Sequence, residues 1–127
     1  MIPEVLSKIV DLNEKEYSDL VVSSKVYFYK VRLILIDKSF IDISIPSKSF
    51  KNRFNFHWER RHLDNTFYRY DNFPNTKWKK IKGYPYHFHC GSQDKVAESK
   101  FGKKIIKGFG DFMEFVRIRL NEINKNK

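Results

Sequence analysis

Three segments of the chain alternate between apolar and polar residues, and this alternation limits the possible folds more than any other feature. The pattern runs through residues 40–45, 53–59 and 66–71. Its apolar members are Ile41, Ile43, Ile45, Phe54, Phe56, Trp58, Tyr68 and Tyr70. Because successive side chains of a β-strand point to opposite faces, the pattern predicts strands of an antiparallel sheet with one buried face.

Helices are predicted at both ends of the chain. Apolar residues at helical spacing predict a short helix over residues 2–10. A longer apolar stripe over residues 105–120, interrupted by the weak helix formers Gly108 and Gly110, predicts a C-terminal helix. We expect residues 121–127 beyond it to fray.

The remaining pattern completes a small α+β fold. β-branched and aromatic residues predict further strands over residues 26–36 and 86–89, whereas residues 11–22 favour no element. We therefore expect a four- to five-stranded, mainly antiparallel sheet with N-terminal and C-terminal helices packed on its apolar face. A length of 127 residues suits a single domain over residues 1–127, with a core over about residues 2–120.

The composition favours a cytoplasmic protein. Cys90 is the only cysteine, so no internal disulfide can form. The chain opens with no signal-peptide pattern, and no apolar run approaches the ~18 residues that a membrane span needs. These observations predict a protein of the reducing cytoplasm that does not bind membranes.

The formal net charge of +10 predicts an anionic partner, and RNA is the leading candidate. A lysine-rich composition imposed by an A+T-rich genome is the alternative explanation. In the loop around residues 77–82, charge is interleaved with an aromatic ring, as backbone attraction and base stacking would require. The candidate nucleic-acid-binding residues are Arg53, Lys77, Trp78, Lys79, Lys80 and Lys82. A solvated basic loop is an equally good interpretation.

A group of chemically active residues is predicted on the polar side of the sheet. If the apolar faces of neighbouring strands share one core, His57, Arg69, Asp71, His87 and His89 all project from the opposite side. Two histidines could transfer the protons of RNA cleavage, and Arg69 could stabilise charge on the phosphate. Asp71 could either hold a histidine in the required tautomer or pair with Arg69. This set predicts a metal-independent ribonuclease that needs no cofactor.

Two other functions use the same residues. His87 and His89 could bind a metal ion with His57 or Asp71 as third ligand, which would make the protein a metal-dependent hydrolase. Neither a His-Glu-x-x-His nor a paired Cys-x-x-Cys motif accompanies them. The third interpretation is a non-catalytic module that binds nucleic acid or an antitoxin through the basic loop.

Two motifs resemble a known family. The segments 68–74 (Tyr-Arg-Tyr-Asp-Asn-Phe-Pro) and 85–89 (Pro-Tyr-His-Phe-His), with the flanking segments 37–42 and 55–58, are similar to the TumE-like toxins. The resemblance covers about residues 30–115. It implies a toxin of a toxin–antitoxin pair, loosely similar to the RelE and ParE toxins, with a helix-turn-helix antitoxin as partner. Both a monomer and a homodimer fit this interpretation.

Overall fold

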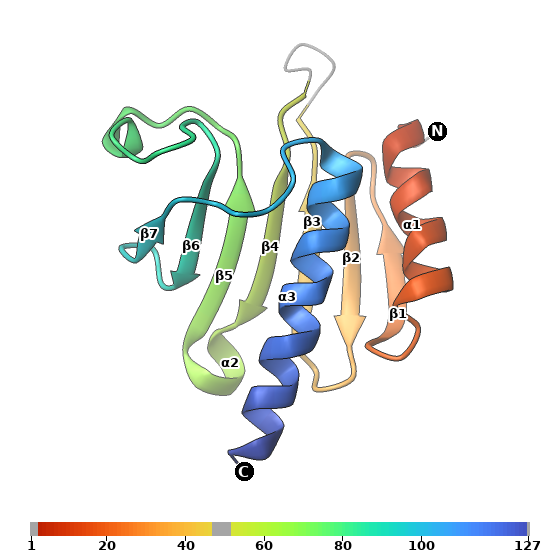
Figure 1. Ribbon diagram of the computed structural model, residues 1–127. Helices are drawn as coiled ribbons and strands as arrows, with labels where there is room; N and C mark the ends of the chain where they lie inside the picture. Colours follow the sequence, from red (N-terminus) through yellow and green to blue (C-terminus); the bar gives the residue numbers. More distant parts are fainter. Residues whose placement is uncertain (1–2, 47–51, 127) are drawn as a thin grey trace.

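The computed structural model describes residues 3–46 and 52–126, and its centre is a seven-stranded antiparallel sheet (Figure 1). The strands lie side by side in chain order, so each pairs with the next along the sequence. They are β1 (Val21–Val26), β2 (Lys30–Leu35), β3 (Phe40–Ser44), β4 (Asn55–Arg60), β5 (Thr66–Asp71), β6 (His87–Gly91) and β7 (Val96–Ala97). The helices are α1 (Glu4–Glu16), α2 (Arg61–Asp64) and α3 (Ile105–Lys125), and a 3₁₀ turn, η1, covers Thr76–Trp78.

The α+β class is confirmed, but the predicted count of four to five strands is wrong. The two additional strands lie at the edges of the sheet. β1 is exposed at every residue after Val21, so it lacks the alternation that identifies a half-buried strand. The predicted strand over residues 26–36 is accordingly divided, because Val26 ends β1 and β2 begins at Lys30. β7 has only two residues, too few for any periodicity.

Both terminal helices are longer than predicted. α1 continues to Glu16, six residues beyond the predicted end, and Ile2 lies outside the described residues. α3 continues to Lys125, so residues 121–125 are helical, and their fraying stays a prediction. Its last turns are largely exposed and carry an ion pair between Arg119 and Glu122. No helix of the described chain is long and apolar enough to cross a membrane.

The helices α1 and α3 cover one face of the sheet, where the core lies (Figure 1). The alternate residues of β2, β3 and β4 are buried there, as the sequence pattern predicted for β3 and β4. The largest fully buried side chains are Trp58, Tyr70, Phe54, Phe56, Phe109, Phe112, Leu6, Ile9, Leu33, Leu35, Ile41 and Ile43. Each such side chain contributes about 1.5–3 kcal/mol by leaving water, so this single core fixes which way every strand faces.

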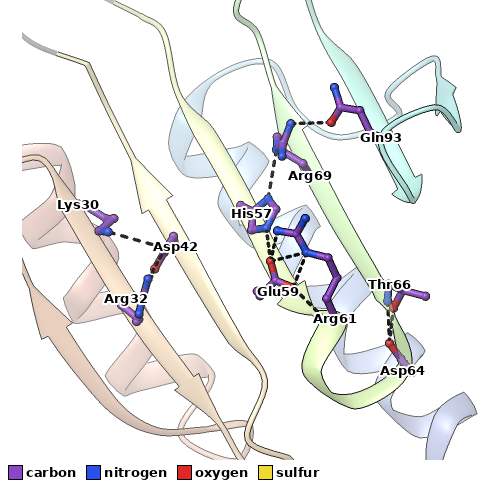
Figure 2. Close-up of polar contacts among 10 residues, drawn as sticks. All are labelled: Lys30, Arg32, Asp42, His57, Glu59, Arg61, Asp64, Thr66, Arg69 and Gln93. Atoms are coloured by element: carbon purple, nitrogen blue, oxygen red, sulfur yellow. Dashed lines mark hydrogen bonds and ion pairs between the residues drawn. The ribbon is translucent and has the colours of Figure 1, made fainter.

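The opposite face of the sheet is not covered by these helices and carries the polar residues of the alternating pattern. Figure 2 shows the face with α3 behind the strands. On β2 and β3, Arg32 Nε donates to Asp42 Oδ1 at 2.7 Å. Further along the sheet, β4 and β5 present His57 and Arg69. A polar surface built on several rigid strands is therefore available for function.

Gly108 and Gly110 of α3 occupy different surroundings, which predicts opposite effects of alanine. A Cβ at Gly108 would lie 2.7 Å from the backbone oxygen of Gly102 and 3.2 Å from Cε2 of Tyr70, whereas one at Gly110 would meet only Tyr17 Oη at 3.7 Å. We expect Gly108→Ala to lower the free energy of unfolding by about 1–3 kcal/mol. Gly110→Ala should raise it by up to about 1 kcal/mol because alanine favours helix. Urea denaturation measures both, and a stabilised Gly108→Ala variant would contradict the close packing of α3 on the sheet.

Candidate functional site

The strand register brings all five predicted site residues to the open face. Arg69 on β5 lies directly opposite His57 on β4 and His89 on β6, and Asp71 lies opposite His87. Directly opposed residues of an antiparallel pair share a face. A pocket of about 220 Å³ opens among these strands and the adjoining loops. It is lined by Asn55, Arg69, Asp71, Phe73, Asn75, Trp78, His87, His89 and Gln93.

His89 offers an unprotonated nitrogen to the pocket. Its Nδ1 lies 3.0 Å from the backbone oxygen of Gln93, and because a carbonyl only accepts, Nδ1 carries the proton. Nε2 is then left with a lone pair. Burial, opposed by this hydrogen bond and reinforced by the charge of Arg69, lowers the pKa of His89 to about 4. His89 is therefore neutral at pH 7 and can accept a proton or bind a metal ion.

His87 and Asp71 form a buried pair of titratable side chains. His87 Nδ1 donates to the backbone oxygen of Pro85 at 2.8 Å, and its Nε2 lies 3.4 Å from Asp71 Oδ2. Because two facing lone pairs would repel, a proton on either of these two atoms would make the contact favourable. Burial raises the pKa of Asp71, against the opposing effect of the His87 charge. The pair can therefore hold a proton beside the proton acceptor His89, whose ring centroid lies 5.0 Å from that of His87.

Arg69 brings a positive charge that is not neutralised by an ion pair. Within residues 3–46 and 52–126, no carboxylate lies within 4.0 Å of its guanidinium nitrogens. Its Nε donates to His57 Nδ1 at 3.1 Å and its Nη1 to Gln93 Oε1 at 3.2 Å (Figure 2). Burial lowers the pKa of this arginine, because taking the charged guanidinium partly out of water is unfavourable. A half-buried cation in a polar pocket is suited to binding an anion.

His57 is placed to orient Arg69. Its Nε2 donates to Glu59 Oε1 at 3.1 Å, while its Nδ1 accepts from Arg69, so both ring nitrogens are occupied (Figure 2). Burial lowers the pKa of His57, which keeps the ring neutral and able to accept. His57 does not line the pocket. This geometry favours a positioning role over the proton transfer that the sequence predicted.

The predicted nucleic-acid-binding residues separate into two groups. Trp78 lines the pocket, and its ring centroid lies 5.9 Å from that of His89. Lys77 lies over the Trp78 ring, 4.9 Å from its centroid. Lys79, Lys80 and Lys82 follow it and are exposed. Arg53, in contrast, donates to the backbone oxygen of Asn72 at 2.6 Å, a contact that holds the end of β5 against the start of β4.

Asn72 also holds the backbone together. Its side chain accepts from the backbone nitrogen of Phe54 at 2.8 Å and donates to the backbone oxygen of Asn52. The side chain that closes the turn is that of Asp71, which accepts from the backbone nitrogen of Phe73 at 3.0 Å. One carboxylate oxygen of Asp71 is thereby anchored and the other faces His87.

Four pocket residues were missed by the sequence analysis: Asn55, Phe73, Asn75 and Gln93. Gln93 is the most consequential, because its backbone oxygen holds His89 and its side chain holds Arg69. It lies in the turn after β6, where the sequence carries no distinguishing signal. Asn55 could have been found, since it belongs to the polar set of the alternating segment 53–59 and lies opposite Asp71.

The same pocket holds a set of potential metal ligands. Asp71, His87 and His89 are buried, and one donor atom of each lies within 4.8 Å of the others. Both histidines donate Nδ1–H to a backbone carbonyl, which is the usual orientation of a metal-binding histidine with Nε2 as ligand. Of the two third ligands that the sequence left open, the geometry selects Asp71 over His57.

Comparison with known proteins identifies the family. The family model described as toxin TumE matches residues 6–120. Comparison with curated proteins and with solved structures gave no match in either case. The matched residues include every residue of the pocket and nearly the whole chain. The chain therefore belongs to the TumE family, whose members are the toxins of toxin–antitoxin systems, so its implied partner is an antitoxin.

Proposed function

We propose that this toxin is a ribonuclease that works without a metal ion, with the pocket on the open face as its active site. The observation that carries the proposal is Arg69, a half-buried cation with no carboxylate partner among the described residues, beside a proton acceptor and a proton donor. Those three elements are what phosphodiester cleavage requires.

The proposed reaction is an attack of the RNA on its own phosphate. His89 Nε2 takes the proton of the 2′-hydroxyl, and the 2′-oxygen forms a bond to phosphorus. The bond from phosphorus to the 5′-oxygen breaks, and that oxygen receives the proton held between His87 and Asp71. The products are a 2′,3′-cyclic phosphate and a free 5′-hydroxyl. Arg69 neutralises the charge that grows on the phosphate, and His57 and Gln93 keep its guanidinium in place.

The surroundings of the pocket support an RNA substrate. The net charge of +10 attracts a polyanion, and Lys79, Lys80 and Lys82 are exposed beside the pocket residue Trp78. Phosphate contacts of this kind give affinity without sequence preference. The same positive surface would suit an antitoxin that presents acidic residues, and we propose that its helix-turn-helix antitoxin competes with RNA for it.

Removing the proton acceptor or the cation tests the proposal. We expect His89→Ala and Arg69→Ala each to slow cleavage of a mixed-sequence, end-labelled RNA by at least about 100-fold. Arg69→Lys should recover part of the loss, since it keeps the charge but not the planar fork. His62→Ala is the matched control, because His62 is exposed and bonds only the backbone oxygen of Lys38. Circular dichroism confirms that each variant is folded.

The ribonuclease proposal would be rejected if the wild type arrests growth on induction but cuts neither free RNA nor the mRNA on translating ribosomes. The non-catalytic binding module would then be the better account. Arrest by both wild type and His89→Ala would point to the same conclusion.

The pH profile provides a second test. A general base works only when unprotonated, so its activity is lost as the pH falls through its pKa. Because the pKa of His89 is lowered to about 4 by burial, we expect kcat/KM to stay constant down to about pH 5 and to fall only below that value. An acidic limb centred near 6.5, the ordinary value for histidine, would show that His89 is not the base. Single-turnover cleavage from pH 4 to 8 measures this.

A metal-dependent hydrolase is the second candidate, favoured by the closeness of the Asp71, His87 and His89 donor atoms. In that case these residues would hold a divalent ion, which would polarise the phosphate. For the metal-independent enzyme we expect full activity after dialysis against EDTA. Loss of activity under chelation, recovery with zinc or manganese, and loss of metal binding in His87→Ala would establish the second candidate instead.

A further inference from the structure

The pocket contains more than the proposed chemistry uses. Trp78 and Phe73 supply aromatic surface, and Asn55 and Asn75 supply side-chain amides. Neither aromatic ring is fully buried. Amides with an adjoining aromatic ring are the groups that proteins use to recognise nucleobases, by hydrogen bonds to the base edge and by stacking on its face. The phosphate and the sugar hydroxyl of an RNA strand need none of these side chains.

Asn55 is the most informative of them. Its side-chain oxygen is buried and has no hydrogen-bond partner within the described residues, although its amide lines the pocket. A buried polar atom left without a partner destabilises a protein, so it requires an explanation. A half-turn of the amide about its last bond exchanges its oxygen and nitrogen, which allows either to meet a ligand in the pocket. A bound base would supply the missing partner.

The geometry places this amide close to the proposed chemistry. Asn55 lies directly opposite Asp71, the partner of His87, and Trp78 lies against His89. The Nζ of Lys77 lies over the Trp78 ring and 4.0 Å from Asp94 in the β6–β7 turn. The pocket of about 220 Å³ is smaller than the ~300–1,000 Å³ of ordinary small-molecule sites, so it suits one base rather than several.

We propose that the pocket binds one unpaired nucleobase next to the scissile phosphate, stacked on Trp78 and hydrogen-bonded by Asn55. The inference rests on the proposed ribonuclease and narrows its substrate to RNA in which a base is free to leave the stack. A paired base would present neither its face nor its pairing edge. The toxin would therefore cut single strands and loops and spare duplexes.

The experiment compares two short 2′-O-methyl RNAs, which bind but cannot be cleaved because the attacking hydroxyl is blocked. One has a complete sequence, and the other lacks the base at a single central position. Fluorescence anisotropy at a fixed salt concentration gives both affinities. Because the position that enters the pocket is not known beforehand, a series of further oligonucleotides each lacks the base at a different position. We expect loss of the base at one position to weaken binding about tenfold and at the others much less.

The variants assign the effect to the pocket. Trp78→Ala and Asn55→Ala should bind the complete strand about tenfold more weakly and should no longer distinguish it from the gapped strand. Trp78→Phe should retain the distinction because it keeps an aromatic face. Phe28→Ala is the matched control, since Phe28 is an aromatic residue of the β1–β2 turn that is 64% exposed and does not line the pocket.

The outcomes separate this inference from the proposed function. Equal binding of complete and gapped strands at every position overturns the base pocket, even if wild type cleaves RNA. A distinction that persists unchanged in both Trp78→Ala and Asn55→Ala also overturns it. Base-dependent binding that both variants abolish supports the base pocket. If the wild type then fails to cleave the same strand made of ordinary RNA, only the ribonuclease proposal is rejected.

Discussion

The register between β4, β5 and β6 is the constraint on which the rest of the structure depends. Trp58 and Tyr68 lie opposite each other on the core side, and this pairing forces His57 and Arg69 to lie opposite each other on the open side. A shift of one residue in this register would turn one of the two strands over, which would place either Arg69 in the core or Trp58 in water. The free energy of the core therefore also holds the site together, although core and site share no face of the sheet.

Backbone carbonyls decide how protons are arranged in the pocket. The oxygens of Pro85 and Gln93 each accept from a histidine Nδ1, which leaves the two Nε2 atoms to face the pocket. His87 then lies 3.4 Å from a carboxylate oxygen of Asp71, while His89 forms no ion pair within the described residues and lies near the charge of Arg69. Two residues of one type thus acquire different surroundings, and a difference of this kind is what acid–base chemistry requires.

The site lowers the stability of the protein in ways that the core must offset. Asp71 and His89 are buried although both carry polar, titratable groups. Removing such groups from water costs free energy, so a sheet with a purely structural role would keep them exposed. Asn55 leaves a buried oxygen unpartnered within the described chain, and Arg69 is desolvated without a carboxylate. Such defects are commonly found where a protein binds a ligand that supplies the missing contacts.

The sequence by itself determined the faces of the sheet. Alternation in β3, β4 and β5 predicted which residues face the core, and it therefore also predicted that His57, Arg69, Asp71, His87 and His89 share the other side. The apolar stripe of α3 predicted its packing in the same way. These properties depend on side-chain direction, which repeats with a period of two residues in a strand and 3.6 in a helix, so a local pattern is enough.

Only the tertiary structure decided what each of these residues contacts. The edge strand β1 and the short β7 have no periodic signal, and their positions follow from pairing with neighbours. Gln93 bonds Arg69 across 24 residues, and Glu59 and Arg69 together occupy both nitrogens of His57. Hydrogen bonds depend on the distance between atoms and not on the spacing of residues in the chain, so no pattern in the sequence predicts which histidine accepts a proton and which one holds the arginine.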